Sequence, residues 1–392
     1  MKYNFADRIN HMDSKEISQI MGTLSNPRII SLSAGSPSMD LFPVKELKEC
    51  ANMTYADASS SIFQYSTAEG FLPLRNWIVN KHNLENNTSF NEKNIVISNG
   101  SQQGIDLTSK TFLNKGDVIL CENPTYTVAL SAFKSYECNF LGIESDEHGM
   151  IISDLEKAIE SVSNAKLIYI VPNFQNPTGS TWDEKRRIQL VEVATKHNLI
   201  IVEDDPYRDI SFVPNVRSSI TKYDSVGNVI SLGSFSKSLC PGLRLGWIIA
   251  NNEVIEKIAL AKQITDVQTS YILQQQVYSY LTKYDFQKHL KNISEVYKDR
   301  CTFTCELVDE YLPESVRYKK PDGGLFLWLK LAADIDTLKM LPKAIERGVL
   351  YFPGELFYTD RSTKNCLRLN YSSVKKDKLE EGIVKLGEVF NE

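Results

Sequence analysis

The chain has 392 residues, a formal net charge of −5 and 24% charged residues, a composition typical of ordinary globular proteins. A chain of this length can bury a large core and is expected to form two or three domains. Its mild acidity and scattered basic residues argue against nucleic-acid binding, because a nucleic-acid site needs a cluster of positive charge.

The chain start and the cysteines indicate the compartment. The N-terminal residues are polar, so no signal peptide is predicted, and no apolar run approaches the length of a membrane-spanning helix. Seven cysteines are scattered, with only Cys301 and Cys305 close together, and the five histidines show no metal-ligand spacing. We therefore expect a cytoplasmic protein with reduced thiols that binds neither a membrane nor a metal ion.

Short apolar runs alternate with helical patterns through the middle of the chain. Unbroken apolar strands that alternate with helices predict an α/β domain around a mainly parallel sheet, covered on both faces. After about residue 285 a long helical stretch and short strands near GGLFLWLKL and CLRLNY predict a second, smaller α+β domain. The predicted strands of the first domain lie at 94–98, 117–121, 166–171, 199–203, 228–232 and 244–250.

Ligands of such sheets bind at the carboxyl ends of the strands, so the residues that follow each run are candidates. Ser101 follows the first run, where a helix start could bind a phosphate or simply carry an ordinary serine cap. Tyr126 follows the second run and could stack on a flat ligand or belong to the core. Asn176, in the turn after the third run, could point its amide into the cleft, but a plain turn is an equally good interpretation.

Two adjacent carboxylates follow the fourth run. A buried aspartate needs a cation or hydrogen-bond donors, so Asp204 predicts a positively charged partner. Tyr207 stands close enough in the sequence to add its hydroxyl. The alternative is a solvated acidic turn.

The fifth run leads into a segment with a lysine among small hydroxyl residues. Ser234 and Ser236 come shortly before Lys237, and Arg244 follows seven residues after the lysine, so the segment can bind an anion. Such cationic, partly buried surroundings lower the pKa of a lysine, which leaves a neutral amine for imine formation. The alternatives are a surface lysine on a loop rich in glycine and serine, or an S-x-x-K acylating serine, which would need a K-T-G that is absent after residue 237.

These groups together fit one ligand. Pyridoxal 5'-phosphate has a phosphate, a flat ring, a phenolic oxygen, a ring nitrogen and an aldehyde, and it is typically held by a lysine imine with an acidic partner for the ring nitrogen. The predicted phosphate site, stacking tyrosine, amide, buried carboxylate and amine match these parts. We therefore predict pyridoxal 5'-phosphate as the cofactor.

The ordered motifs resemble those of the fold-type I pyridoxal-phosphate aminotransferases of class I/II, and most closely the subgroup of 2-aminoadipate and kynurenine aminotransferases. The resemblance implies a large cofactor-binding domain at 46–285 around a mainly parallel seven-stranded sheet. It also implies an N-terminal segment at 1–45 that joins the small domain, a C-terminal small domain at 286–392, and a homodimer with active sites at the interface. The motifs are SLSAGSPSMDLFP, QYSTAEGFLPLR, NGSQQGIDL, NPTG, EDDPY, SFSKSLCPGLRLGW, PDGGLFLW, GVLYFPGELF and CLRLNY.

The resemblance also implies roles for individual residues. Lys237 would bind the cofactor and move the substrate α-proton, and Asp204 would keep the ring nitrogen protonated. Asn176 and Tyr207 would hydrogen-bond the phenolic oxygen, and Tyr126 would stack on the ring. The phosphate would be bound by Ser101, Gln102, Ser234, Ser236 and Arg244. The implied catalytic group is Lys237, Asp204 and Tyr207. The implied cofactor contacts within one chain are Ser101, Gln102, Tyr126, Asn176, Asp204, Tyr207, Ser234, Ser236, Lys237 and Arg244.

Four further contacts come from the same resemblance. Tyr65 would reach the phosphate in the partner subunit, so that one chain alone would be an incomplete enzyme. Arg368 would clamp the substrate α-carboxylate, with Gly35 and Asn176 as further substrate contacts. From the residues alone, Arg368 could equally be a surface arginine on a strand.

The implied reaction is ping-pong transamination between an L-amino acid and a 2-oxo acid such as 2-oxoglutarate. A lyase or cyclase reaction on the same fold stays open. A non-catalytic effector-binding domain is a remote alternative, because the aminotransferase pattern begins within the first thirty-odd residues and leaves no room for a preceding DNA reader.

The donor amino acid could be aromatic, aliphatic or similar to 2-aminoadipate. Relatives that accept 2-aminoadipate often carry an arginine in the N-terminal helix, here SKEISQIMGTL, where Ser18 stands instead. This serine favours an aromatic or aliphatic donor. The segment SLSAGSPS also departs from the FAGGLPNP-like pattern of relatives, which could reshape the substrate pocket.

Overall fold

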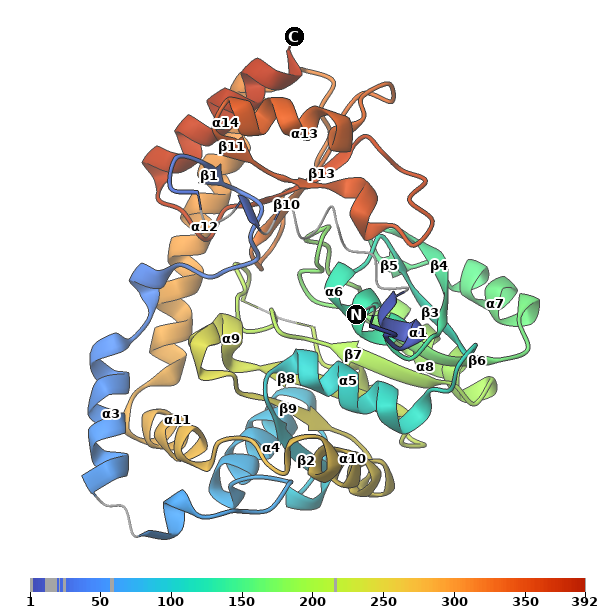
Figure 1. The fold of residues 1–392 in the computed structure, drawn as a ribbon, viewed down its shortest axis with the longest axis vertical. Coiled ribbons are helices and arrows are strands. Elements are labelled where there is room, and N and C mark those ends of the chain that lie inside the picture. Colours follow the sequence, from blue (N-terminus) through green and yellow to red (C-terminus); the bar gives the residue numbers. More distant parts are fainter. Residues whose placement is uncertain are drawn as a thin grey trace.

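The computed structural model describes residues 3–10, 20, 22–23, 26–56, 60–214 and 217–391. A large sheet with helices around it occupies the lower part of Figure 1, and two small sheets with α12, α13 and α14 form the upper part. The helices are α1 (Asp7–Asn10), α3 (Val44–Ala56), α4 (Leu72–Asn86), α5 (Ser101–Phe112), α6 (Thr127–Lys134), α7 (Ile152–Ser161), α8 (Glu184–Lys196), α9 (Phe235–Ser238), α10 (Asn252–Asp266), α11 (Tyr271–Lys283), α12 (Phe286–Tyr311), α13 (Thr337–Glu346) and α14 (Lys376–Phe390).

The large sheet has eight strands in the order β2-β9-β8-β7-β6-β3-β4-β5. Strands β8, β7, β6, β3 and β4 pair in parallel, whereas β9 is antiparallel to both of its neighbours and β5 is antiparallel to β4. The strands are β2 (Ile95–Ser98), β9 (Gly246–Ile249), β8 (Val229–Ser234), β7 (Ile200–Asp204), β6 (Ala165–Ile170), β3 (Val118–Asn123), β4 (Asn139–Asp146) and β5 (Gly149–Met150).

The mainly parallel α/β sheet is confirmed, but it has eight strands where seven were expected. The additional strand is β5, and its two residues are too few to leave an apolar run in the sequence. Strand β4 also gave no run, because only one of its eight positions is fully buried. The other large-sheet strands are buried at most or all positions and appear in the sequence as apolar runs.

Helices cover both faces of this sheet, as the alternation of side chains along β6 shows. Leu167 and Tyr169 belong to one buried cluster with residues of α5, such as Ile105. Ile168 and Ile170 belong to a second buried cluster with residues of α7 and α8. Successive side chains of a strand point to opposite faces, so each strand contributes to both clusters.

The upper part contains a three-stranded antiparallel sheet and a two-stranded parallel sheet. Helix α12 runs from beside α11 up to these sheets (Figure 1). The pairing of β1 with β11 brings the segment after residue 26 to the C-terminal part of the chain, although the domain limits 1–45, 46–285 and 286–392 remain predictions. The strands are β10 (Phe326–Lys330), β13 (Cys366–Asn370) and β12 (Phe352–Pro353), and β1 (Ile30–Ser31) with β11 (Val349–Leu350).

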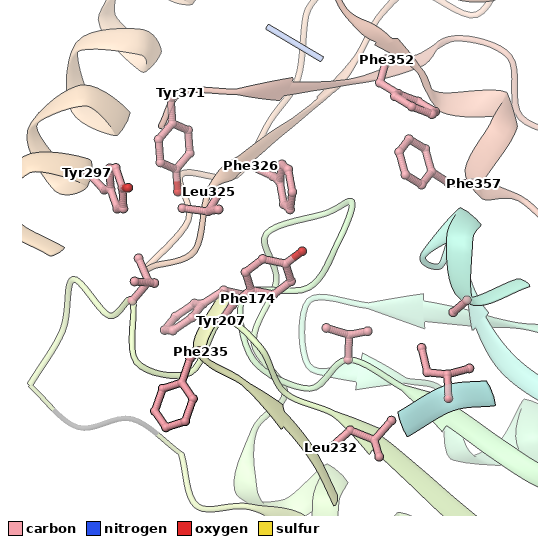
Figure 2. Close-up of a cluster of buried hydrophobic side chains, with 14 of the residues drawn as sticks. Phe174, Tyr207, Leu232, Phe235, Tyr297, Leu325, Phe326, Phe352, Phe357 and Tyr371 are labelled. Carbon is pink, nitrogen blue, oxygen red and sulfur yellow. The ribbon is translucent and has the colours of Figure 1, made fainter. Parts of the chain in front are cut away.

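Aromatic side chains pack where the upper part meets the large sheet. Figure 2 shows Phe326 and Tyr371 pointing down from the upper sheet toward Phe174 and Tyr207. The rings of Tyr207 and Phe326 meet edge to face, with centroids 5.6 Å apart. This contact holds the upper part over the carboxyl ends of the large-sheet strands. Within the described part of the chain, no helix is long and apolar enough to cross a membrane.

Candidate active site

A cavity lies at the carboxyl ends of β6, β7 and β8. Its lining includes all ten cofactor contacts expected within one chain, together with Val171, Pro206 and Pro241. Residues that lie up to 143 positions apart in the sequence thus come together, from Ser101 to Arg244. The side chains predicted from the strand ends therefore do lie around one cavity.

Asp204 ends β7 and is 2% exposed. The hydroxyl of Tyr169 donates a hydrogen bond to its Oδ2 at 2.8 Å, whereas Oδ1 has no hydrogen-bond partner among the described residues. Burial raises the pKa of Asp204 to about 6, against the opposing effects of the Tyr169 hydrogen bond and the charge of Lys237. The solvated-turn interpretation is therefore wrong, and one buried carboxylate oxygen is left for a partner.

Lys237 lies in the short helix α9, directly after β8. Its Nζ donates to the carbonyl oxygen of Gly35 at 2.8 Å. Burial, together with the positive charges of Arg368 and Arg244, lowers the pKa of Lys237 to about 8, in the direction that the sequence predicted. Lys237 is thus a partly buried amine, not a surface lysine on a loop rich in glycine and serine.

A cation and several hydroxyl groups also line the cavity, and such groups suit an anion. Ser101 begins α5, and the N-cap is Gly100 with a φ of 84°, so Ser101 is not the cap itself. The Arg244 guanidinium donates to the carbonyl oxygen of Asn99 at 3.0 Å, and its Nη1 lies 3.5 Å from Ser236 Oγ. A Cβ atom at Gly100 would lie 2.7 Å from Arg244 Nη2, and the φ of 84° is one that other residues rarely adopt, so a substitution would strain the backbone and displace the end of the arginine.

Three polar side chains surround the middle of the cavity. Tyr126 precedes α6, and burial raises its pKa to about 12, so its hydroxyl keeps its proton. Tyr207 is buried beside Phe326, and burial raises its pKa as well. Asn176 is buried in the turn after β6 and accepts a hydrogen bond from Arg368 Nη1 at 2.6 Å. Asn176 therefore lies in a turn and also lines the cavity.

Arg368 lies in the middle of β13 and is 5% exposed. Its Nη2 donates to the carbonyl oxygen of Ser33, and its Nε has no hydrogen-bond partner among the described residues. The guanidinium carbon lies 4.3, 4.9 and 5.0 Å from three phenylalanine ring centroids, a cation–π arrangement. Burial lowers the pKa of Arg368 to about 10, and the surface-arginine interpretation is wrong. The three rings belong to Phe326, Phe352 and Phe357.

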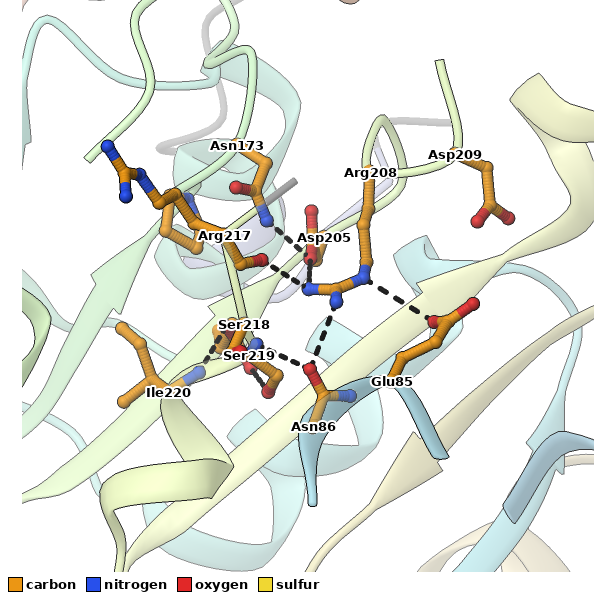
Figure 3. Close-up of polar contacts among 12 residues, drawn as sticks. Glu85, Asn86, Asn173, Asp205, Arg208, Asp209, Arg217, Ser218, Ser219 and Ile220 are labelled. Atoms are coloured by element: carbon orange, nitrogen blue, oxygen red, sulfur yellow. Dashed lines mark hydrogen bonds and ion pairs between the residues drawn. The ribbon is translucent and has the colours of Figure 1, made fainter. Parts of the chain in front are cut away.

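A polar network on the other side of β7 holds the backbone of the site. Figure 3 shows Arg208 pointing between Asp205, Asn86 and Glu85. Arg208 donates to Asn86 Oδ1 at 3.0 Å and lies 3.8 Å from Asp205 Oδ2, which also accepts from Asn173 at 2.8 Å. Asp205 and Arg208 directly follow Asp204 and Tyr207 in the chain, so the network fixes their backbone. The sequence reasoning missed this network.

Tyr169 was also missed. The sequence reasoning considered residues after each strand, whereas Tyr169 lies inside β6. The sequence did offer a signal, because a tyrosine in an otherwise aliphatic buried run carries a hydroxyl that needs a hydrogen-bond partner.

One predicted cofactor contact is not at this cavity, and one specificity prediction falls on a residue that is not described. Tyr65 is 78% exposed and does not line this cavity. Ser18 lies outside the described residues.

Known proteins share both the sequence pattern and the fold. A family model described as aminotransferase class I and II matches residues 27–386. An aromatic-amino-acid aminotransferase of Thermococcus litoralis is 37% identical, over 99% of this chain and 94% of the relative.

Two solved structures superpose closely on the chain. A kynurenine aminotransferase of Pyrococcus horikoshii, in complex with PMP, has a TM-score of 0.94 and 37% identity over 99% of this chain and 96% of that chain. An α-aminoadipate aminotransferase of Thermus thermophilus, complexed with N-(5'-phosphopyridoxyl)-L-leucine, has a TM-score of 0.91 and 30% identity over 99% of this chain and 97% of that chain.

Proposed function

The chain belongs to the class I and II aminotransferases, and we propose that it uses pyridoxal 5'-phosphate to move an amino group from an aromatic or aliphatic L-amino acid to a 2-oxo acid such as 2-oxoglutarate. The observation that carries this proposal is the convergence of Lys237 and Asp204 in one cavity, with Arg368 bonded to Asn176 of its lining. The aminotransferase relatives favour transamination over the lyase and cyclase reactions of the same fold.

The residues of the cavity fit the cofactor. Asp204 has a buried carboxylate oxygen without a partner among the described residues, which suits a protonated ring nitrogen. Arg244 and the hydroxyls of Ser101 and Ser236 line the same cavity, which suits a phosphate. When bound, the cofactor supplies an electron sink that stabilises negative charge at the substrate α-carbon.

The side chains of this chain would then share the remaining tasks. Lys237 would hold the cofactor, and its Nζ would take the substrate α-proton and return it, because its lowered pKa lets it act as both base and acid. Asp204 would hold the proton on the ring nitrogen. Tyr207 and Asn176 would hydrogen-bond the phenolic oxygen, and Tyr126 would stack on the ring. These roles follow the family pattern.

Arg368 would bind the substrate α-carboxylate. Its Nη1 and Nη2 each use a donor on protein groups, and its Nε has no partner among the described residues, so three of its five N–H donors are left for a carboxylate. Gly35 lies beside Lys237 and would limit the space next to the substrate. The clamp would fix the α-carbon within reach of the Lys237 amine.

The donor side chain is proposed from charge. The cations that line the cavity are Lys237 and Arg244, and both are used for the cofactor. Arg368 is used for the α-carboxylate, so the described surroundings offer no further cation for a second acidic group of 2-aminoadipate. An aromatic or aliphatic side chain is therefore preferred, in line with the names of two of the relatives.

The same proposal includes a homodimer in which Tyr65 binds the phosphate in the partner subunit. Tyr65 is exposed, and the apolar side chains of Tyr55, Phe63 and Leu72 near it in the chain are also exposed, at 56%, 64% and 47%. A second copy of the chain would cover this apolar surface. We also propose a cytoplasmic location, which is supported by seven free cysteines.

Absorbance spectroscopy tests the proposed function. Purified protein with added cofactor is expected to show the visible band of a lysine-linked cofactor, and aromatic or aliphatic amino acids should bleach it and release the matching 2-oxo acid. Lys237→Ala is the control, which should show no such band. If amino acids instead release pyruvate and ammonia without an acceptor, the lyase alternative is right. If no cofactor binds, the proposal fails.

A further inference from the structure

The hydroxyl of Tyr169 contacts Asp204, which lines the candidate cofactor site. Tyr169 is fully buried in β6 and does not line the cavity. Its Oη donates to Asp204 Oδ2 at 2.8 Å, and Asp204 Oδ1 lacks a partner within the described ranges of the chain. One carboxylate oxygen is thus held from below while the other is left for the cavity.

The geometry of two parallel strands produces this contact. Tyr169 pairs with Val202 in the register of β6 and β7, and Asp204 lies two residues further along β7 on the same face. The ring of Tyr169 is held by Phe133, with centroids 5.3 Å apart and nearly perpendicular planes. The hydroxyl is therefore fixed in place before any ligand binds.

In the hydrogen bond between these two residues, Tyr169 is the donor and Asp204 is the acceptor. Burial raises the pKa of Tyr169, and the nearby Asp204 raises it further, so the hydroxyl keeps its proton and donates it to the carboxylate. The same hydrogen bond lowers the pKa of Asp204, against the effect of burial, and so favours the ionised form. An ionised carboxylate is what a protonated ring nitrogen requires.

We propose that Tyr169 is a positioning residue that keeps Asp204 ionised and turned toward the ring nitrogen of the cofactor. This inference rests on the proposed function. It assigns a task to a side chain that touches neither substrate nor cofactor and acts through Asp204 alone.

A comparison of two ligands separates this role from ordinary packing. The probes are pyridoxal 5'-phosphate and its analogue with a C–H group in place of the ring nitrogen, which has no proton to share with Asp204. Tyr169→Phe, which removes only the hydroxyl, is expected to weaken binding of pyridoxal 5'-phosphate about tenfold and to leave binding of the analogue unchanged. Comparing the two affinities cancels any general loss of stability.

Two further variants complete the test. Tyr351→Phe is the matched control, because Tyr351 is also a buried tyrosine, but its hydroxyl donates to the carbonyl oxygen of Thr337 away from the cavity. It should leave both affinities unchanged. In an Asp204→Asn background, Tyr169→Phe should cause no further loss of affinity, because the two residues act as a unit.

The outcomes distinguish the inference from its premise. If Tyr169→Phe weakens both ligands equally, or neither, Tyr169 has only a packing role and the inference is overturned while the proposed function stands. If the unaltered protein binds neither ligand, the proposed function fails and the inference fails with it.

Discussion

Replacement of Arg368 by lysine tests whether this arginine recognises the substrate carboxylate. Arginine has five N–H donors in a planar fork, and Arg368 uses two of its terminal groups on Asn176 and on the carbonyl oxygen of Ser33. A lysine keeps the charge but cannot offer two parallel donors. The expected loss is one charge-assisted hydrogen bond of about 1.5–3 kcal/mol, or about 10–150-fold in kcat/KM.

The assay is the rate of the first half-reaction, measured by the loss of the cofactor absorbance band at increasing amino-acid concentration. The same measurement with the amide of that amino acid, which lacks the carboxylate, isolates the contact. Arg368→Lys should lower kcat/KM for the acid and change it little for the amide. Arg300→Lys is the matched control, because Arg300 is also buried but donates to the carbonyl oxygen of Ser372 outside the cavity.

Two results would refute this reasoning. An Arg368→Lys variant that keeps kcat/KM for the acid within about threefold would show that no paired contact exists. An equal loss for the acid and the amide would show that Arg368 serves only the packing of its three phenylalanine neighbours, Phe326, Phe352 and Phe357.

Three other measurements test the cofactor site and the dimer. Because the pKa of Lys237 is lowered from 10.5 to about 8, more of its amine is neutral at a given pH. The rate of cofactor attachment, measured by rapid-mixing absorbance, should therefore rise with pH and level off above about 8. A rate that levels off only near 10.5 would contradict the burial argument. Gly100→Ala places a Cβ atom 2.7 Å from Arg244 Nη2 at a φ of 84°, so cofactor affinity should fall about tenfold with circular dichroism unchanged, and unaltered affinity would show that Arg244 does not hold the phosphate. Mixing Lys237→Ala with Tyr65→Ala chains should restore about a quarter of the normal activity, because mixed dimers regain one intact site, and no recovery would mean that Tyr65 serves its own subunit.

The sequence predicted the family and the general fold, and both are confirmed. It also selected the strand-end residues that meet in the cavity, because parallel strands present their carboxyl ends at one edge and each run announces where its strand ends. The mainly parallel sheet was predicted, but β5 and β4 left no readable pattern, since β5 is two residues long and β4 is mostly half-exposed.

The local sequence pattern by itself determined where most strands end and which polar residues follow them, because hydrophobic period and turn composition depend on a few neighbouring positions. Only the tertiary structure decided how distant segments meet. The contact of Lys237 with Gly35 spans 202 positions, and that of Arg368 with Asn176 spans 192. The bond between Tyr169 and Asp204 depends on the register of two strands. Such contacts are set by the packing of the whole chain, because burial removes the water that would otherwise satisfy each polar group and leaves it to find a partner within the protein.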